Sequence, residues 1–285
     1  MGHCLGVIGG SGLYDIDGVE RVSEERIDTP FGAPSDTLVR ARVGDTELLF
    51  LPRHGRGHRF SPSEINYRAN VAAMKIAGAT HLVSISAVGS MKEHIAPGDL
   101  VVVDQYIDLT KRRVSTFFES PVVGHVSFSD PVCPVMAGAV SDAARAASGA
   151  KVHDGGTYVC MEGPQFSTRA ESLVYRGWGV SVIGMTAMPE AKLAREAELP
   201  YATLALATDY DCWHDSHGAV SVDAVVATLT KNIAAAKRTI VALAKALPDP
   251  SKSPAHRALD GAVMTAPDAI TPEARARLAF LRTFA

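Results

Sequence analysis

Two aspartates directly follow an apolar run in the stretch "ATDYDCWHD", residues 207–215. If the strand predicted over 201–211 continues through Asp209 and Asp211, its alternation places both side chains on one face. An ionised carboxylate only accepts hydrogen bonds, a protonated one also donates, and an enclosed site favours the protonated form. Such a pair suits a 6-amino purine, whereas an amide at the first position would suit a 6-oxo purine better. The structural alternative is a helix cap or turn.

A basic pair followed by glycines ends another predicted strand, "TELLFLPRHG" at 46–55. A guanidinium fork on Arg53 and an imidazole donor on His54 are suited to a phosphate group. Two alternatives remain open for this segment. It could be a solvated basic loop, or His54 and His58 could bind zinc, although their spacing fits a helix that the neighbouring glycines disfavour.

Small residues end two further predicted strands. In "GVIGGSGLYD", after the strand at 3–9, the glycines let backbone N–H groups approach an anion, and Ser11 adds a hydroxyl. A dinucleotide-binding fingerprint fails because Asp15 stands where a glycine is needed, which leaves an anion site or a tight turn. In "SISAVGSM", Ser86 and Ala87 occupy a strand end where hydroxyl and backbone donors can meet a ligand.

A helix start and a strand end supply the remaining candidates. In "MEGPQFSTRAES", Thr168 and Glu171 have the spacing of a capping box, and Phe166 lies just outside the helix. Phe166 could stack on a flat ring or close the helix start as a hydrophobic staple. In "VIGMTAMPEA", the strand ends at Met185 and Thr186, and the pattern alone would place Met185 in the core.

The elements that must position these residues alternate between strands and helices. Strands are predicted over 3–9, 46–55, 80–90, 98–108, 155–163, 179–186 and 201–211, and helices over 63–79, 188–199, 222–247 and 271–284. Ser63 and Thr271 are the predicted N-caps of the first and last helices. We expect one α/β domain, a central mixed β-sheet flanked by helices, over 1–248, with 249–285 forming a linker and C-terminal helical extension.

The composition is that of a globular protein, and it disfavours several classes of partner. Of 285 residues, 47% are hydrophobic and 21% charged, and the net charge is −3. There is no Lys/Arg block for nucleic acid and no apolar run of the roughly 18 residues that span a membrane. Four cysteines without paired spacing and a start without a signal-peptide pattern predict reduced thiols, no metal site and a cytoplasmic location.

Taken together, these segments resemble the methylthioadenosine phosphorylase branch of the trimeric purine nucleoside phosphorylase family. The matching stretches, in family order from residue 7 to about 247, are "IGGSGL", "DTPFGAPSD", "RHGRGH", "NYRAN", "SAVGS", "PGDLVVVDQYID", "EGPQFSTRAES", "GMTAMPEAKLAREAELPYA" and "ATDYDCW". Each stretch is short, but the ordered set covers most of the chain and is highly specific.

The resemblance implies a role for each candidate residue. It implies a phosphate pocket made of Ser11, Arg53, His54, Ser86, Ala87 and Thr186. Phe166 and Met185 would lie against the base and ribose, and Asp209 and Asp211 would serve the adenine N7 and N6 side. Ser167 and Val222 fall at positions linked to the preference for methylthioadenosine. His125 matches a histidine that is supplied across the subunit interface.

The implied reaction is phosphate attack on C1′ of 5′-methylthioadenosine, without metal or organic cofactor, in a homotrimer or a dimer of trimers. Gly184 departs from some relatives, and "GMTAMPEA" also occurs in relatives that use methylthioinosine, so a 6-oxopurine phosphorylase is the alternative. Asp209 favours the 6-amino base, since those relatives carry Asn there. A hydrolase that uses water and a purine-binding regulatory protein are the more distant alternatives.

Overall fold

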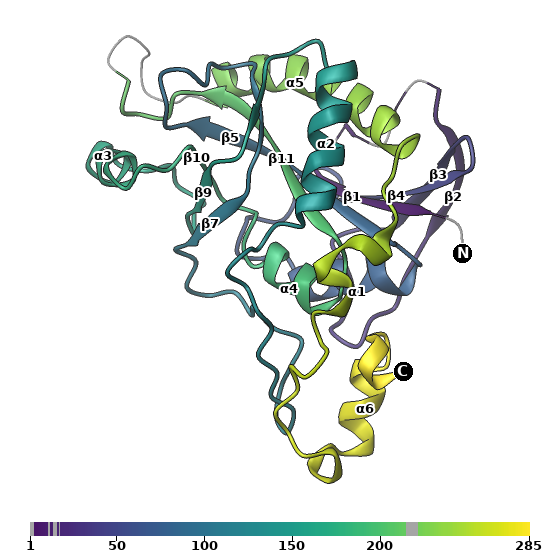
Figure 1. The fold of residues 1–285 in the computed structure, drawn as a ribbon. Helices are drawn as coiled ribbons and strands as arrows, with labels where there is room; N and C mark the ends of the chain where they lie inside the picture. Colours follow the sequence, from purple (N-terminus) through teal and green to yellow (C-terminus); the bar gives the residue numbers. More distant parts are fainter. Residues whose placement is uncertain (1–2, 11, 14–15, 17, 215–221) are drawn as a thin grey trace.

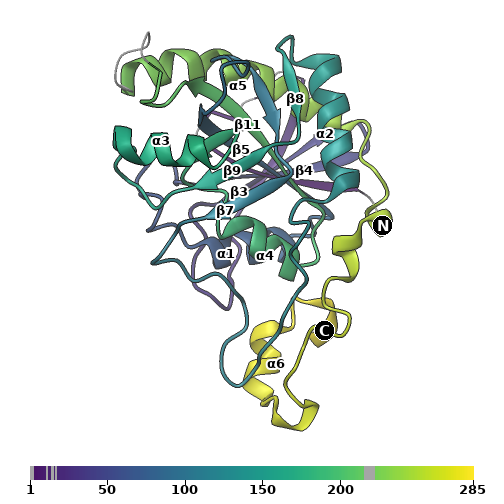
Figure 2. The same cartoon turned by 60° about the vertical axis from the view of Figure 1, so that its left-hand side comes forward.

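Apolar strands form the centre of the molecule and helices cover both faces of their sheet (Figure 1). A computed structural model describes residues 3–10, 12–13, 16, 18–214 and 222–285, without the side chains of 222–227. Helices α2 (Pro134–Ala147) and α5 (Val222–Ala244) cover one face, and α1 (Tyr67–Ile76) and α4 (Glu190–Glu196) cover the other (Figure 2). The expected mixed sheet flanked by helices is confirmed.

The sheet follows the order β2–β3–β4–β1–β5–β10–β9–β7, with β11 on the other edge of β5 and β6 and β8 beyond it. The strands found among the described residues are β1 (Cys4–Gly9), β2 (Glu20–Glu25), β3 (Leu38–Val43), β4 (Thr46–Pro52), β5 (His81–Ser90), β6 (Leu100–Val102), β7 (Gln105–Asp108), β8 (Val152–Asp154), β9 (Thr157–Cys160), β10 (Val182–Gly184) and β11 (Tyr201–Asp209). β1, β4, β5 and β11 run parallel, whereas β10 is antiparallel to β5. The carboxyl ends of four strands therefore meet at one edge, where α/β proteins bind ligands.

Two clusters of buried side chains lie on the two faces of this sheet. One contains residues of α1 and α4, and the other contains residues of α2 and α5. β1 is buried along its whole length and β11 along all but its last residue. Their near-continuous apolar sequences follow from this burial, because helices cover parallel strands on both faces.

Several element boundaries differ from the sequence predictions. α1 begins after Asn66, whose side chain accepts from the Ala69 N–H, and not after Ser63, whose hydroxyl bonds to Glu162. The strand predicted over 98–108 is two strands, because β6 pairs with β11 and β8 whereas β7 pairs with β9. Strands β2, β3 and β8 and helix α2 were not predicted.

Two predicted helix starts are confirmed. Thr168 and Glu171 form a reciprocal capping box at α3 (Arg169–Gly177). The Thr271 side chain accepts from the Ala274 N–H at the start of α6 (Pro272–Leu278). In the described part of the chain, no helix is long and apolar enough to cross a membrane.

The C-terminal segment 249–285, which we call the tail, packs against residues 109–133, which we call the arm. The tail contains α6 and the short 3-10 helices η1 (Pro250–Lys252), η2 (Pro254–Arg257), η3 (Pro267–Ala269) and η4 (Arg282–Phe284). Leu278 and Leu281 are fully buried in the same cluster as Phe117 of the arm, and Gly124 forms a β-bridge with Val263. The tail thus shares a hydrophobic core with the main body, although its end projects from it (Figure 1).

Candidate active site

The two aspartates lie side by side at the end of β11, but the strand does not run through both. β11 ends at Asp209, and Asp211 has a φ of 52°, in the left-handed region. The Asp211 N–H donates to Asp209 Oδ1 at 2.8 Å. A Cβ added at Gly89 of β5 would lie 3.0 Å from Asp209 Oδ1 and 3.3 Å from Asp211 Cβ. The predicted strand through residue 211 is therefore wrong, and a turn brings the carboxyl groups together.

Burial raises the pKa of both carboxyl groups. At Asp209 the charge of Asp211 adds to this effect, while hydrogen bonds from Thr208 Oγ1 (2.6 Å) and the Asp211 N–H oppose it. At Asp211 the Ser172 hydroxyl and the Cys212 N–H oppose it. Among the described residues neither carboxylate forms an ion pair with a Lys, Arg or His side chain. The site can therefore hold a proton on this pair more readily than an exposed aspartate would.

The segment before α3 is tied to the aspartates through Cys212. The Cys212 thiol donates to the Ser167 carbonyl at 3.4 Å, and the Ser167 hydroxyl donates to Met161 Sδ at 3.4 Å. Phe166, the neighbour of Ser167, is 49% exposed, so it is not the staple that one interpretation proposed. About half of the Phe166 surface is exposed next to the residue that bonds to Cys212, and an exposed aromatic face can stack on a ring.

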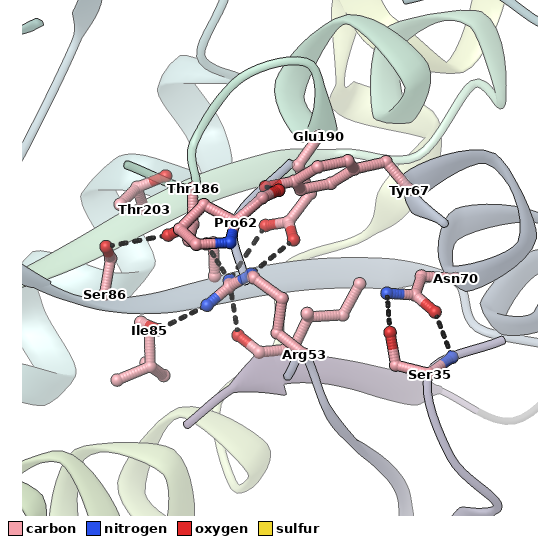
Figure 3. A network of polar contacts seen from close by, with 12 residues as sticks. Ser35, Arg53, Pro62, Tyr67, Asn70, Ile85, Ser86, Thr186, Glu190 and Thr203 are labelled. Atoms are coloured by element: carbon pink, nitrogen blue, oxygen red, sulfur yellow. Dashed lines mark hydrogen bonds and ion pairs between the residues drawn. The ribbon is translucent and has the colours of Figure 1, made fainter. Parts of the chain in front are cut away.

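Two buried hydroxyl groups come together at the end of β5. Ser86 Oγ lies 3.2 Å from Thr186 Oγ1 (Figure 3). It also lies 3.1 Å from Tyr158 Oη. They meet because β10 runs antiparallel to β5, so the chain after β10 passes back along β5. Ala87, next to Ser86, is exposed, and Met185, next to Thr186, is half-buried. This arrangement presents hydroxyl donors on a floor of small residues.

The Arg53 side chain forms hydrogen bonds inside the protein. Its Nε and Nη2 donate to the Glu190 carboxylate at 2.8 and 3.1 Å, Nη2 also donates to Ser84 Oγ (2.7 Å) and the Ile8 carbonyl (3.0 Å), and Nη1 donates to the Ile85 carbonyl (3.1 Å) (Figure 3). The side chain is 2% exposed. Glu190 therefore takes donors of Nε and Nη2, and the contact of Arg53 with phosphate stays a prediction. Through its bonds to Ile8, Ser84 and Ile85, Arg53 also ties β1 to β5.

His54 also differs from the expected donor. Its Nδ1 lies 2.9 Å from the Phe60 carbonyl, which only accepts, so Nδ1 carries the proton. Burial lowers the pKa of His54 to about 4, and the neighbouring charges of Arg53 and His58 contribute. The neutral ring stacks on His58 at 4.1 Å between centroids and offers Nε2 as an acceptor. No group of three or more metal-ligating side chains is found in the described residues, His54 and His58 included.

Sequence reasoning missed Arg113 and Glu190. Arg113 is buried, and its Nη1 donates to the Met185 and Met188 carbonyls, both at 2.6 Å, while Nη2 donates to the Glu162 carbonyl at 2.7 Å. It thereby fixes the loop that carries Met185 and Thr186. In the sequence it stands in "KRR", which gives no sign of burial. Glu190 follows that loop directly, but no local pattern points to Arg53, 137 residues away.

Packing explains why residue 184 is a glycine. A Cβ at this position would come within 2.0 Å of the Tyr158 hydroxyl oxygen. That hydroxyl is the one that contacts Ser86. Gly184 therefore makes room for Tyr158, which gives its small size a reason other than the choice of base.

One predicted site residue that the structure describes, His125, is not brought to this place. It is exposed on the arm, where its N–H donates to the Ala262 carbonyl of the tail at 2.8 Å. It lines a hollow of about 500 Å³ together with Arg195 and Asp130, which contains neither aspartate of the pair. Ser11 and the side chain of Val222 lie outside the described residues.

The fold and this strand-end site define a member of the phosphorylase superfamily, whose family model matches residues 5–245. The chain belongs to that family. Among its relatives is the S-methyl-5′-thioadenosine phosphorylase of Geobacter sulfurreducens, which is 53% identical over 279 residues, covering 98% of this chain and 97% of the relative. The enzyme of the same name from Cereibacter sphaeroides is 52% identical over 281 residues, covering 98% and 97%.

Solved structures agree with the sequence relatives. A methylthioadenosine phosphorylase from an antarctic soil metagenomic library has a TM-score of 0.92 and 47% identity, with 98% of each chain covered. The methylthioadenosine phosphorylase of Schistosoma mansoni in complex with adenine has a TM-score of 0.84 and 38% identity, covering 88% of this chain and 94% of that one. The expected nucleoside phosphorylase fold is confirmed.

Proposed function

We propose that this protein catalyses the phosphorolysis of 5′-methylthioadenosine to adenine and 5-methylthioribose 1-phosphate. The observation that carries the proposal is the pair of carboxyl groups at the end of β11, whose pKa values burial raises and which pair with no cation among the described residues. The relatives that share half of the sequence over nearly the whole chain bear the name of this activity. The enzyme is a pentosyltransferase that acts in purine and methionine salvage.

The base end of the site stabilises the leaving group. As the bond from C1′ to the purine breaks, negative charge develops on the base. Asp209, with its raised pKa, carries a proton that it donates towards N7 as that charge grows. Asp211 accepts from the exocyclic amino group and orients the ring, and Phe166 offers a face for stacking.

The phosphate end positions the nucleophile. Hydroxyl donors of Ser86 and Thr186 and the backbone at Ala87 face the phosphate oxygens, with Ser11 as a further donor. Neutral His54 accepts a hydrogen bond on Nε2 from the P–OH group of a hydrogen phosphate, without taking its proton. Holding phosphate close to C1′ supplies much of the rate through positioning. Arg53 acts through the strand ends that it supports.

The proposal includes no metal or organic cofactor, since proton transfer and positioning by the protein account for each step. Chelation with EDTA is expected to leave the rate unchanged. The four cysteines are free, three of them buried, which supports a reducing compartment such as the cytoplasm. A drop in activity on chelation that added metal reverses would require a revised mechanism.

The proposal also includes a homotrimer in which His125 completes the site of a neighbouring subunit. Its support is the exposure of His125 on the arm and the absence of the aspartate pair from the hollow that it lines. Mixing the inactive variants His125→Ala and Asp209→Ala should restore part of the activity, because some sites then combine intact residues from two subunits. Lack of recovery in refolded mixtures would place His125 outside the site.

The first experiment measures nucleoside cleavage spectrophotometrically with purified protein. Methylthioadenosine is assayed with and without phosphate, and inosine and methylthioinosine are assayed alongside. We expect cleavage of methylthioadenosine that requires phosphate, with little cleavage of either 6-oxo nucleoside. Cleavage without phosphate would make the protein a nucleosidase, and a preference for 6-oxo nucleosides would reverse the interpretation of the aspartates. Adenine binding without turnover would make it a regulatory protein.

A further inference from the structure

Helix α3 buries one side chain. Of Arg169–Gly177, only Ser172 is buried, with no exposed surface, whereas Leu173 and Val174 on the same helix are about half exposed, at 52% and 51%. The helix lies at the margin of the molecule, apart from the layers that cover the sheet (Figure 1). A helix that buries a single polar residue and exposes apolar ones is not held there by hydrophobic burial alone.

The buried residue contacts the base-recognition pair. Ser172 Oγ donates to Asp211 Oδ2. Asp211 lies after the end of β11 with a φ of 52° and is 5% exposed. The direction of the Asp211 side chain is therefore not set by the alternation of side chains along a strand. In the part of the chain that the structure describes, the Ser172 hydroxyl, the Cys212 N–H and, at 4.0 Å, the Cys212 thiol are the groups that contact its carboxylate.

We propose that Ser172 is a positioning residue that holds Asp211 as an ionised acceptor for the exocyclic amino group of the base. A serine hydroxyl has one proton, and the Ser172 hydroxyl uses it in the hydrogen bond that it donates to Asp211 Oδ2. Oδ1 is then the oxygen assigned to the amino group. The inference rests on the proposed function, because it takes the base-binding role of Asp211 from there.

The contact also divides the two carboxyl groups by role. Thr208 Oγ1 lies 2.6 Å from Asp209 Oδ2 and 3.2 Å from the Val88 carbonyl. If the Thr208 proton goes to the carbonyl, Asp209 can donate its own proton to Thr208 or to a base. For the Ser172 hydroxyl, the alternative acceptor is the Cys212 sulfur, which is a weaker acceptor than a carboxylate or a carbonyl oxygen. The donor on Asp211 thus favours the charge there and leaves the shared proton on Asp209.

A second contact couples the same helix to the substrate-facing segment. The Ser167 carbonyl, two residues before the first residue of α3, accepts from the Cys212 thiol at 3.4 Å. The Arg176 guanidinium near the end of the helix stacks on the Trp213 ring at 3.8 Å. The helix is therefore attached along its length to residues 211–213, and Ser172 is the attachment that reaches the carboxylate.

The test compares Ser172→Ala with Glu171→Ala. Glu171 is exposed on the same helix, and its loss removes half of the capping box without touching Asp211. We expect Ser172→Ala to lower kcat/KM for methylthioadenosine by roughly tenfold to 100-fold, as for a lost hydrogen bond to a charged group. Its selectivity over methylthioinosine should fall by a similar factor, because an unheld Asp211 takes up a proton and can donate to a 6-oxo group. Ser172→Thr, which keeps the hydroxyl, should retain the selectivity.

A double-mutant cycle with Asp211→Ala separates this role from helix stability. If Ser172 acts through Asp211, Ser172→Ala should change selectivity by less than about twofold once Asp211 is alanine. Additive effects, or equal selectivity in Ser172→Ala and Glu171→Ala, would overturn the proposal. Thermal unfolding of each variant shows whether it is folded.

Adenine binding keeps the test independent of turnover. Calorimetry with adenine alone should show about tenfold weaker binding for Ser172→Ala than for the wild type, with Glu171→Ala unchanged. If the wild type bound adenine but did not cleave methylthioadenosine, the proposed function would fail while this measurement still decided the role of Ser172. Equal adenine affinity in Ser172→Ala and the wild type would overturn the inference by itself.

Discussion

Carboxylates are buried in two different ways at the two ends of the site. Below the phosphate end, Glu190 has no exposed surface and is paired with Arg53 through two hydrogen bonds. At the base end, Asp209 and Asp211 receive hydroxyl and backbone donors, and no cation from the part of the chain that the structure describes. A paired buried charge fixes structure, whereas an unpaired one gains affinity for a proton. The difference supports the proposal that one end of the site is a rigid support and the other supplies the proton.

The largest expected effect comes from breaking the paired end. Arg53→Ala leaves Glu190 buried without its cation, which should cost about 3–5 kcal/mol of stability and lower Tm by roughly 5–15 °C. The double variant Arg53→Met with Glu190→Leu removes both charges and should recover at least half of the loss. Thermal unfolding measures both. A normal Tm for Arg53→Ala with a greatly raised KM for phosphate would instead place the guanidinium on the substrate.

Removing the proton donor should act on the rate and spare the fold. Asp209→Ala is expected to lower kcat for methylthioadenosine by about 10²- to 10³-fold, roughly 2.7–4 kcal/mol, with Tm unchanged or raised. Steady-state kinetics and thermal unfolding check this. A wild-type kcat in the variant would show that Asp209 does not take part in the reaction.

The pH dependence of the wild type follows from the same carboxyl group. Because burial raises the pKa of Asp209 and the acid must carry its proton, kcat should be level at low pH and fall as pH rises through that pKa. Asp209→Asn together with Asp211→Ala should remove this alkaline fall and shift preference towards 6-oxo nucleosides. An unchanged adenosine-to-inosine ratio in the double variant would count against the assignment of the pair.

Glu196 sharpens the comparison, since it lies outside the site and is buried without forming an ion pair to any residue that the structure describes. It accepts from Thr116 Oγ1 and the Phe117 N–H, and burial raises its pKa to about 7. Its protonated form is favoured in the folded state, so stability is greatest below the unfolded pKa of about 4.5 and is lost as pH rises to about 7. Glu196→Gln should remove this slope and be more stable than the wild type at pH 8, by up to about 3 kcal/mol. Parallel unfolding curves from pH 5 to 8 for both proteins would contradict this.

The smallest expected effect concerns the donor to Asp209. Thr208→Val keeps the shape of a buried side chain but removes its hydroxyl from Asp209 Oδ2. The loss should lower kcat/KM by about fivefold, near 1 kcal/mol, without changing the choice of base. Kinetics with methylthioadenosine and methylthioinosine provide the check. If Thr208→Val changed the base preference as much as is expected for Ser172→Ala, the two carboxyl groups would not have separate roles.

Local spacing allowed some features to be predicted from the sequence. The capping box of Thr168 and Glu171 and the cap at Thr271 depend on residues within one helical turn, so they are visible in a linear pattern. The alternation of side chains along a strand correctly predicted that Asp209 and Asp211 lie close together. The reason was wrong, because a turn at Asp211 replaces the strand. The sequence carries no mark of that change in backbone direction.

Long-range partners could not be predicted. Arg53 and His54 have the residue types of a phosphate site, but Glu190 and the Phe60 carbonyl determine which of their atoms are free. Ser86 and Thr186 meet across 100 residues, and the family resemblance grouped them where no local pattern did. Ser172 looked like any helix residue, since a buried serine and an exposed one are identical in a sequence.

The bridge between Gly124 and Val263 has a consequence for the order of folding. It joins two segments far apart in the sequence, and Leu278, Leu281 and the Ala262 carbonyl hold the arm from the same distant segment. Such non-local contacts form slowly, because the entropy of closing a long loop must be lost before the contacts are gained. We therefore expect the surface that carries His125 to form later than contacts between neighbouring strands.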